Sequence, residues 1–425
     1  MTTRWRRRMG GGLLAAFLGA SPSCDHPEEA PATPVPPVQV ASATLYDADP
    51  RHLWNRIAGS LNTWQVKGSA KTTVDLDPLL WPSEEYSLMG DAQRAAVPLL
   101  DEFLRSDGEK LIRDPLRRAL FQSNLWLLYD WAASSRDRDL ERRLAAVLKR
   151  VALSADEIRA LPDTYAAALA SRAYPPAFDP DRPDDPFLPA ELLDPTGPWI
   201  LLGNERGREK LPLAQKHVTF FEGRSSFLIF LKLPDGRREG LEFVEKLRDP
   251  KKAPLGASSP RSGSQLALLR RAFVLDDAGR IVPTPIVESL QLRVHGDFPA
   301  GRKLPAGFFE RMTKFDLRRQ RLLAGERGGL WALGPEDREP LYVLSLGFFP
   351  SRAADGVPAA GNPLERCILC HTSGGRLESQ ARMFFEIPRP ALAATTLAEE
   401  ERRAAAWKEG QPSFQRLRQS WKGTR

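Results

Sequence analysis

The chain is poor in cysteine and histidine: its 425 residues include 3 cysteines and 5 histidines. Cys367 and Cys370 lie three positions apart in the segment ERCILCHTSGG, whereas Cys24 lies near the amino terminus. No second cysteine pair and no HxxxH spacing accompanies them. This scarcity disfavours a structural zinc site, which needs four such ligands.

The sequence also lacks the motifs of several common enzyme classes. It contains no GxxxxGK[ST] phosphate loop, no GxSxG nucleophile turn, no HExxH zinc motif and no dinucleotide-binding fingerprint. No hydrolase or transferase activity is therefore predicted. Whether the protein is an enzyme stays open at this point.

Long apolar runs are missing, and the one notable apolar stretch near the start is short. The first 24 residues, MTTRWRRRMGGGLLAAFLGASPSC, have the layout of a bacterial export signal, with a basic stretch, an apolar run and then small residues. The apolar run, Gly10–Ala20, is too short to cross a bilayer as a helix. The sequence therefore predicts export.

A signal that ends at a lone cysteine resembles the lipobox of bacterial lipoproteins. The resemblance implies that residues 1–23 are removed and that Cys24 is lipidated. The family prefers leucine where this chain has Ser21, so an ordinary signal-peptidase cut, near Ala20 or Ser23, is the alternative.

Residues 24–45 are rich in proline and are predicted to form an extended tether. Such a spacer holds an anchored protein clear of a membrane surface. The predicted location is the periplasmic side of the cell envelope, with a lipid anchor in a membrane.

The charge balance gives no support for nucleic acid as a partner. The formal net charge is +7, and the export signal alone contributes Arg4, Arg6, Arg7 and Arg8. Without them the net charge is about +3, which is only mildly basic.

The order of patterns predicts an α+β protein. Residues 46–175 have helical periodicity, 176–350 are rich in strand signals, and 351–425 form a small segment with the cysteine pair and C-terminal helices. Asp114 and Pro115 are predicted to start a helix with one buried face, and Leu140–Ala152 to form a second. Capping boxes are predicted at Ser154 and Thr396.

Strands are predicted over Val218–Phe221, Ser226–Leu233, Gln265–Leu275 and Val287–His295. In the last of these, Gln291, Arg293 and His295 alternate with apolar residues. The segment 309–323 is ambiguous between helix and strand. Its many basic side chains are predicted to form a solvated face, and the alternative is a docking site for an acidic partner.

The strongest chemical signal is CxxCH, formed by Cys367, Cys370 and His371. In c-type haem attachment, two cysteine thioethers reach the two vinyl groups of one porphyrin from a single chain turn, and the next histidine binds the iron. Export agrees with this assignment, because haem c is attached outside the bacterial cytoplasm. The alternatives are a disulfide or redox pair, or zinc.

The motif resembles the start of a cytochrome c domain, and the resemblance implies one covalent haem c with His371 as the proximal iron ligand. The distal ligand is open. Met383 is the one methionine that follows the motif, and His52, His217 and His295 are the other candidates in the ordered chain.

The leading expectation is a membrane-anchored, mono-haem c-type protein that carries single electrons to an unidentified redox partner. One alternative is a haem-dependent oxidoreductase or sensor with an open iron position for peroxide or a gas. Another is a binding lipoprotein in which the CxxC forms a disulfide. The segment ALFQSNLWLLYDW, together with the late CxxCH, resembles a group of uncharacterised exported bacterial proteins.

Overall fold

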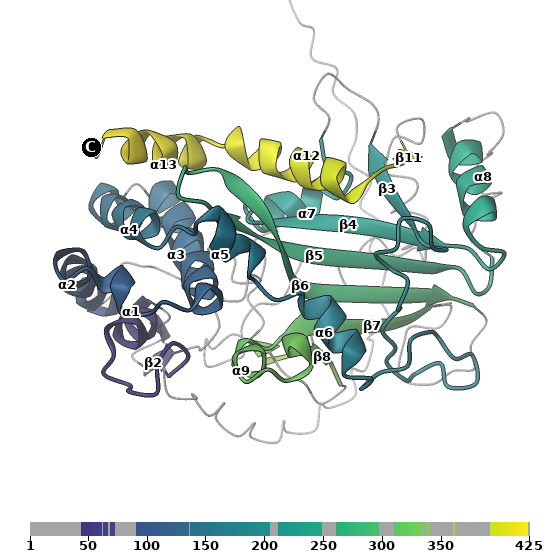
Figure 1. The fold of residues 1–425 in the computed structure, drawn as a ribbon, viewed down its shortest axis with the longest axis horizontal. Helices are drawn as coiled ribbons and strands as arrows, with labels where there is room; N and C mark the ends of the chain where they lie inside the picture. The colour runs from purple at the N-terminus through teal and green to yellow at the C-terminus, as the bar shows by residue number, and fades with distance from the viewer. Residues whose placement is uncertain are drawn as a thin grey trace, which may run out of the picture. The chain divides into compact units, whose positions relative to one another are not determined.

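A seven-stranded antiparallel sheet lies at the centre of the fold in the computed structural model (Figure 1). The structure describes residues 44–61, 63–66, 69–72, 91–135, 137–204, 211–248, 261–296, 310–334, 337, 339–340, 360–361 and 392–423. All of them belong to one unit, Val40–Arg425. The chain is of the α+β class, as its sequence predicted.

The strand order of the sheet is β11-β3-β4-β5-β6-β7-β8, so β11 and β8 are its two edges. The strands are β3 Ile200–Asn204, β4 Ser225–Lys232, β5 Gln265–Leu275, β6 Ile281–His295, β7 Glu310–Leu317, β8 Leu330–Ala332 and β11 Leu392–Ala394. Two small hairpins stand apart from this sheet: β1 Thr63–Val66 with β2 Ser69–Thr72, and β9 Glu339–Pro340 with β10 Ala360–Gly361.

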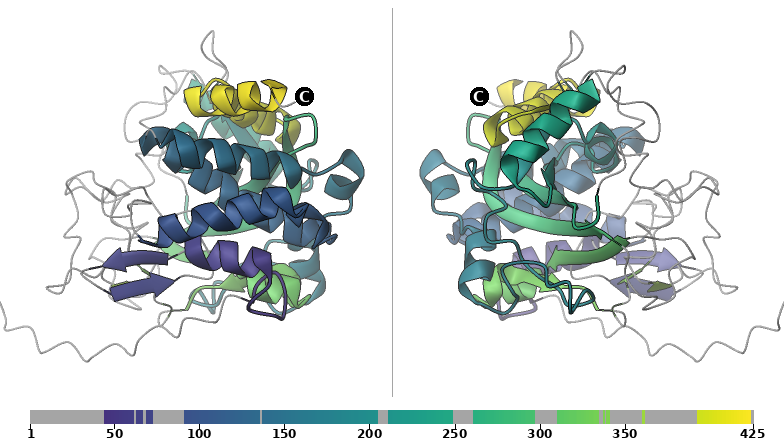
Figure 2. Two further views of the ribbon diagram at one scale, coloured as in Figure 1. Left: turned by 90° about the vertical axis from the view of Figure 1, so that its left-hand side faces the viewer. Right: turned by 90° about the vertical axis from the view of Figure 1, so that its right-hand side faces the viewer.

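A group of helices lies at one end of the sheet (Figures 1 and 2). They are α1 Leu53–Leu61, α2 Asp91–Arg105, α3 Pro115–Ser135, α4 Arg138–Arg150 and α5 Ala155–Arg159, whereas the next helix, α6 Thr164–Ala170, packs against β6. The others are α7 Gln215–Phe220, α8 Arg237–Arg248, α9 Arg319–Leu323, α12 Leu397–Glu409 and α13 Pro412–Gly423, with 3-10 turns at Gly108–Lys110 and Arg327–Gly329. None of the helices in the described ranges is both long enough and apolar enough to cross a membrane.

The predicted caps are found where the sequence places them. Asp114 Oδ1 accepts the Leu116 N–H at 2.9 Å at the start of α3. Ser154 and Glu157 form a complete capping box on α5, and the Thr396 hydroxyl accepts the Glu399 N–H on α12. Both bonds of the capping box are present at Ser154, whereas the cap shown at Thr396 is the single Glu399 bond. All of these bonds satisfy N–H groups that a helix start leaves without intrahelical partners.

Helix α3 is buried on more than the single face that was predicted. Nearly every side chain in its middle is buried, including the polar Gln122, Asn124 and Asp130. Gln122 explains how a polar group is accommodated there: its amide donates to the Leu275 carbonyl at 2.8 Å and accepts the Leu275 N–H at 2.7 Å. This pair of bonds fixes α3 to the end of β5.

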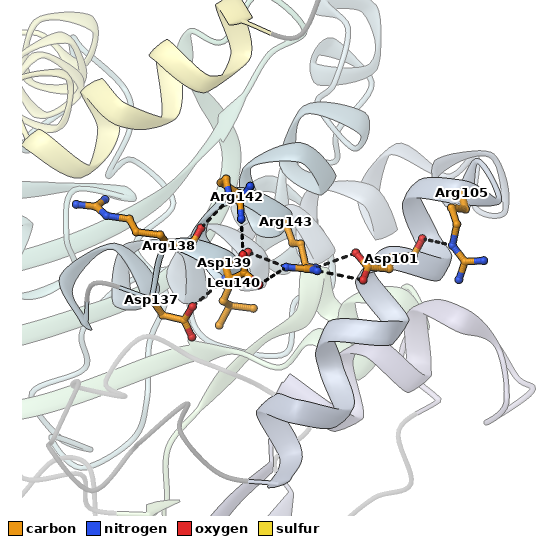
Figure 3. A network of polar contacts seen from close by, with 8 residues as sticks. All are labelled: Asp101, Arg105, Asp137, Arg138, Asp139, Leu140, Arg142 and Arg143. Carbon is orange, nitrogen blue, oxygen red and sulfur yellow. Dashed lines mark hydrogen bonds and ion pairs between the residues drawn. The ribbon is translucent and has the colours of Figure 1, made fainter.

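An ion network links α2 to α4 (Figure 3). Arg143 donates to both oxygens of Asp101, at 2.8 and 3.3 Å, and to Asp139 one turn earlier. Asp137 caps α4 by accepting the Leu140 N–H at 3.0 Å. Because these charges are largely solvated, the pairs contribute little to stability.

The strand predicted at Val218–Phe221 is wrong, since Gln215–Phe220 is helix α7. Its β-branched and aromatic residues favour a strand locally, but tertiary packing overrides that preference: Val218 is fully buried, and Phe221 packs against Phe227 of β4 with ring centroids 4.8 Å apart. Gly223, at φ +67°, reverses the chain after the helix.

A buried charge cluster fixes the C-terminal helices to α3. Lys408 of α12, with no exposed surface, donates to both Asp130 oxygens at 2.7 and 2.8 Å. Arg224 and the Ser413 hydroxyl complete the shell around that carboxylate, at 3.0 and 3.2 Å. Burial lowers the pKa of Lys408, and the Asp130 carboxylate opposes that change.

Replacing one member of this cluster tests its role. We expect Lys408→Met to lower the free energy of unfolding by about 3 to 5 kcal/mol, because Asp130 would remain buried without its ammonium partner. Lys422→Met, at an exposed site on α13, should change it by less than about 0.5 kcal/mol. Urea unfolding followed by circular dichroism measures both values, and equal effects would contradict the account.

Candidate functional site

The residues predicted to bind haem or lipid lie outside the described residues. This applies to Cys24, Cys367, Cys370, His371 and Met383. The described part of the chain contributes the three histidine candidates for the distal position and the scaffold around them. Within the described residues, no group of three or more histidine, cysteine or acidic side chains is placed to hold a metal ion.

The three histidines separate into two environments. His52 precedes α1, and its Nδ1 accepts the Trp54 N–H at 3.3 Å, which is a local role at a helix start. His217 on α7 lies against Phe227 of β4, with ring centroids 5.5 Å apart. His295 ends β6, where its backbone bonds to Gly263 and Ser264. His217 and His295 belong to the same face of the sheet, and His52 does not contribute to it.

The sheet face opposite to the one that carries His217 and His295 packs against helices and loops. Arg271 of β5 bonds to Glu401 of α12 at 2.7 Å, and Tyr174 packs edge-on against Phe315 of β7 at 4.9 Å. Helix α6 adds a bond between the Thr164 hydroxyl and the Val287 N–H at 2.7 Å. Figure 1 shows α12 and α6 on this same side of the strands. We call it the helix-covered face.

The other face of the sheet, which carries His217 and His295 and which we call the second face, has a row of polar and cationic side chains. The register pairs Gln291 with Lys314 and Arg293 with Met312 across β6 and β7. Because side chains alternate along a strand, His295 and Asp316 share this face. Its contributors on β5 to β7 are Leu266, Leu268, Arg270, Gln291, Arg293, His295, Met312, Lys314 and Asp316, and we call this surface the cationic half-face.

Several charges of the cationic half-face are buried. Arg293, Lys314 and Asp316 expose 4, 8 and 5% of their surface. Lys314 donates to Asp316 at 2.6 Å, and Arg270 lies 2.9 Å from Glu288. Buried charges of this kind need such partners because they have left water.

The prediction of a solvated basic face over 309–323 is therefore wrong for most of its basic residues, although Arg321 is exposed. The segment divides into β7 and α9, and Arg311, Lys314 and Arg319 are buried. Arg311 points to the helix-covered face and lies 3.2 Å from Asp184, while Arg319 bonds to Asn124 of α3. The alternation of side chains in ERMTKFDL is typical of a strand, but the many basic residues favoured the interpretation as a solvated segment.

His217 remains neutral at physiological pH. Burial, with a contribution from the positive charges of Arg293 and Lys216, lowers its pKa to about 4. A neutral imidazole keeps a lone pair on one ring nitrogen, which is the form that binds metal ions. The effect of Arg293 also shows that α7 lies within electrostatic range of the cationic half-face.

The donor set of this face is chemically suited to a haem. Imidazole and thioether groups, present in His217, His295 and Met312, are axial ligands of haem iron. A guanidinium group, present in Arg293, can pair with a carboxylate such as a haem propionate, whereas the Lys314 ammonium is already paired with Asp316 at 2.6 Å. Sequence reasoning had overlooked Met312, because it considered methionines only after the CxxCH motif.

Comparisons with known proteins identify no relative: no family model, no curated protein and no solved structure matches the chain. The functional assignment therefore depends on the motif and on the chemistry of the described residues.

The low pKa of His217 predicts a pH dependence. Between pH 6.5 and pH 4 the unfolded imidazole takes up a proton that the folded one resists, so folding stability falls as the pH falls. In a Cys367→Ser, Cys370→Ser background, which removes both attachment thiols, we expect this chain to lose on the order of 1 kcal/mol more stability than its His217→Gln derivative between pH 6.5 and pH 5. Urea unfolding at both pH values measures the difference. Equal losses of stability in the two proteins would contradict the lowered pKa of His217.

Proposed function

We propose that this protein is an exported, lipid-anchored c-type haem protein that carries single electrons through one covalent haem. The observation that carries the proposal is the CxxCH motif, Cys367 to His371, in a chain whose first 24 residues have the layout predicted for an export signal. All three cysteines then have a use, one for lipid and two for haem.

The attachment chemistry needs only the residues of the motif and a haem. Each thiol of Cys367 and Cys370 would add its S–H bond across one vinyl C=C bond, which forms a thioether and leaves no product to remove. His371 would then supply the proximal imidazole. When bound, the haem supplies a one-electron couple between ferric and ferrous iron.

The described scaffold supports the proposal through its donor set. A mono-haem carrier needs a second axial ligand and counter-charges for the propionates, and the second face of the sheet contains groups of both kinds. Met383, His217 and His295 are distal candidates, and Met312 on β7 is a further methionine, whose Sδ accepts the Gln291 amide at 2.6 Å. Ligation by methionine or histidine suits electron transfer, whereas an open position would suit peroxide or gas chemistry.

The covalent haem can be tested directly. Protein that is exported in cells with a haem c maturation system should give a c-type pyridine haemochrome spectrum and keep its colour after acid–acetone extraction. We expect the double variant Cys367→Ser, Cys370→Ser to lose all extraction-resistant colour. Cys24→Ser is the matched control, because it removes the third thiol and should leave the haem intact. Colourless wild-type protein would refute the proposal.

The lipid anchor has its own test. We expect the wild-type chain in the membrane fraction and Cys24→Ser in the soluble periplasmic fraction, since the thioether-linked lipid would be lost. Fractionation followed by immunoblotting measures this distribution. A soluble wild-type protein would instead support cleavage by ordinary signal peptidase.

A further inference from the structure

We propose that α12 is a proton-controlled clasp, which closes on α3 and on the helix-covered face of the sheet when carboxyl groups at its buried face bind protons. The proposal concerns Leu397–Glu409 and the described residues that contact this helix. It is independent of the proposed function, because it needs neither a haem nor a lipid. It follows from the composition of the buried face, from the partners of each buried charge and from the effect of burial on carboxyl groups.

The buried face of α12 consists almost entirely of ionisable side chains. The buried residues of this helix are Glu400, Glu401, Arg403, Ala404 and Lys408, and the alanine alone is apolar. Apolar side chains normally stabilise the contact between a helix and a sheet. In a buried ion pair, by contrast, the cost of desolvation offsets most of the attraction. The contact of α12 with the sheet therefore depends on the charges of these side chains.

Helix α13 is held by apolar contacts instead. Phe414 and Leu417 are fully buried, and Phe414 packs against Trp126 of α3 with ring centroids 6.1 Å apart. The Trp421 Nε1–H donates to the Ala145 carbonyl of α4 at 2.9 Å. Because apolar burial does not depend on the proton concentration, α13 is an internal reference for α12.

Each buried carboxyl of α12 depends on one cation among the described residues. Glu401 pairs with Arg271 of β5 at 2.7 Å. Glu400 accepts the Leu213 N–H at 3.1 Å and pairs with Arg403 of its own helix. A carboxylate with so few partners has lost more hydration than these contacts replace, whereas a protonated carboxyl needs less compensation.

Two glycines show how closely α12 approaches the sheet. A Cβ atom on Gly203 of β3 would lie 2.8 Å from Glu400 Oε1. A Cβ atom on Gly223, which has φ of +67°, would lie 2.8 Å from the Trp407 ring and 2.9 Å from Lys408 Cβ. The closed helix therefore holds its charged side chains against backbone rather than against solvent.

A third carboxyl faces the same helix from the turn between α7 and β4. Glu222 is half-buried and has φ of +53°, a left-handed conformation that is unfavourable for a residue with a Cβ atom. Its carboxyl lies within electrostatic range of Asp130, Lys408 and Arg224. Because Asp130 already accepts bonds from both cations, the two carboxyls share one pair of positive charges.

Proton binding favours the closed helix. Burial raises the pKa of Glu222, Glu400 and Glu401, and the negative charge of Asp130 adds to the increase at Glu222. Opening of α12 would return the groups to water, where the ordinary pKa is 4.5. The stability that these groups give to the closed state is thus complete below pH 4.5 and is lost as the pH rises through the raised pKa values.

Other titratable groups near α12 act in the opposite direction. Burial lowers the pKa of Lys408 and of His217 on α7, so both favour the folded state as the pH rises. At α13, bonds from Arg416 and Arg138 outweigh burial and lower the pKa of Glu141. The clasp is therefore tested by removing its carboxyls and not by the pH response of one protein. The remaining charged groups that the described residues bring to α12 are Asp130, Arg224, Arg271, Glu399 and Arg403.

The clasp acts on one edge of the sheet. Thr395 and Thr396 join β11 to α12, and the Thr395 N–H donates to the Leu201 carbonyl of β3 at 2.9 Å. Glu400 lies against Gly203 of the same strand. Closure of α12 therefore reinforces the pairing of β11 with β3.

Hydrogen–deuterium exchange of the full chain, followed by mass spectrometry, measures the opening of α12 and α13 separately. Protection factors, corrected for the chemical exchange rate, would be compared at pH 7 and pH 5. The variant Glu400→Gln, Glu401→Gln removes two proton-binding groups with little change in shape. Glu409→Gln is the matched control, because it removes a carboxyl from the exposed end of the same helix.

We expect the ratio of α12 protection at pH 5 to that at pH 7 to be about threefold or more higher in Glu409→Gln than in the double variant. The ratio for α13 should be the same in both proteins. Equal ratios for α12, or a higher one in the double variant, would overturn the clasp.

Glu222→Gln tests the clasp from outside the helix and keeps the test decisive if the double variant fails to fold. It leaves the sequence of α12 unchanged, so the intrinsic stability of the helix is not altered. We expect a lower ratio for α12 than in Glu409→Gln, and again no change for α13. An α12 ratio equal to that of Glu409→Gln would overturn the part assigned to Glu222.

Discussion

The pairing of β11 with β3 is the constraint on which the rest of this structure depends. It returns the chain to the edge opposite β8 and fixes Leu392 to Ala394 by backbone bonds to Leu202, Gly203 and Asn204. The C-terminal helices follow directly, and Lys408 then anchors α12 to Asp130 of α3. The helical layer, the sheet and the C-terminal helices are therefore joined by contacts between residues far apart in the sequence.

The two faces of the sheet differ in their contacts and in the side chains that they carry. On the helix-covered face, α12, α6 and the segment around Tyr174 make buried aromatic and polar contacts with the strands. The second face concentrates cationic, imidazole and thioether groups over β5 to β7.

Local signals in the sequence predicted much of the fold. Proline after Asp114, the Ser154 box and the alternation through Val294 are short-range patterns, and the α+β class followed from their order. The predictions that were wrong concern residues whose structure depends on tertiary contacts. Val218 joins a helix because Phe221 meets Phe227, and the basic residues of β7 are buried because Asp184 and Asp316 lie beside them. The partners of the cationic half-face come from separate strands, so no local pattern could bring Arg293 and Met312 together.

The most direct test of the central claim is a comparison of amide NMR spectra of the oxidised and reduced protein. Ferric low-spin haem is paramagnetic and shifts nuclei near it, so the proposed function predicts amide resonances that differ in position between the two states. Identical spectra in the two states would contradict the presence of a redox-active haem.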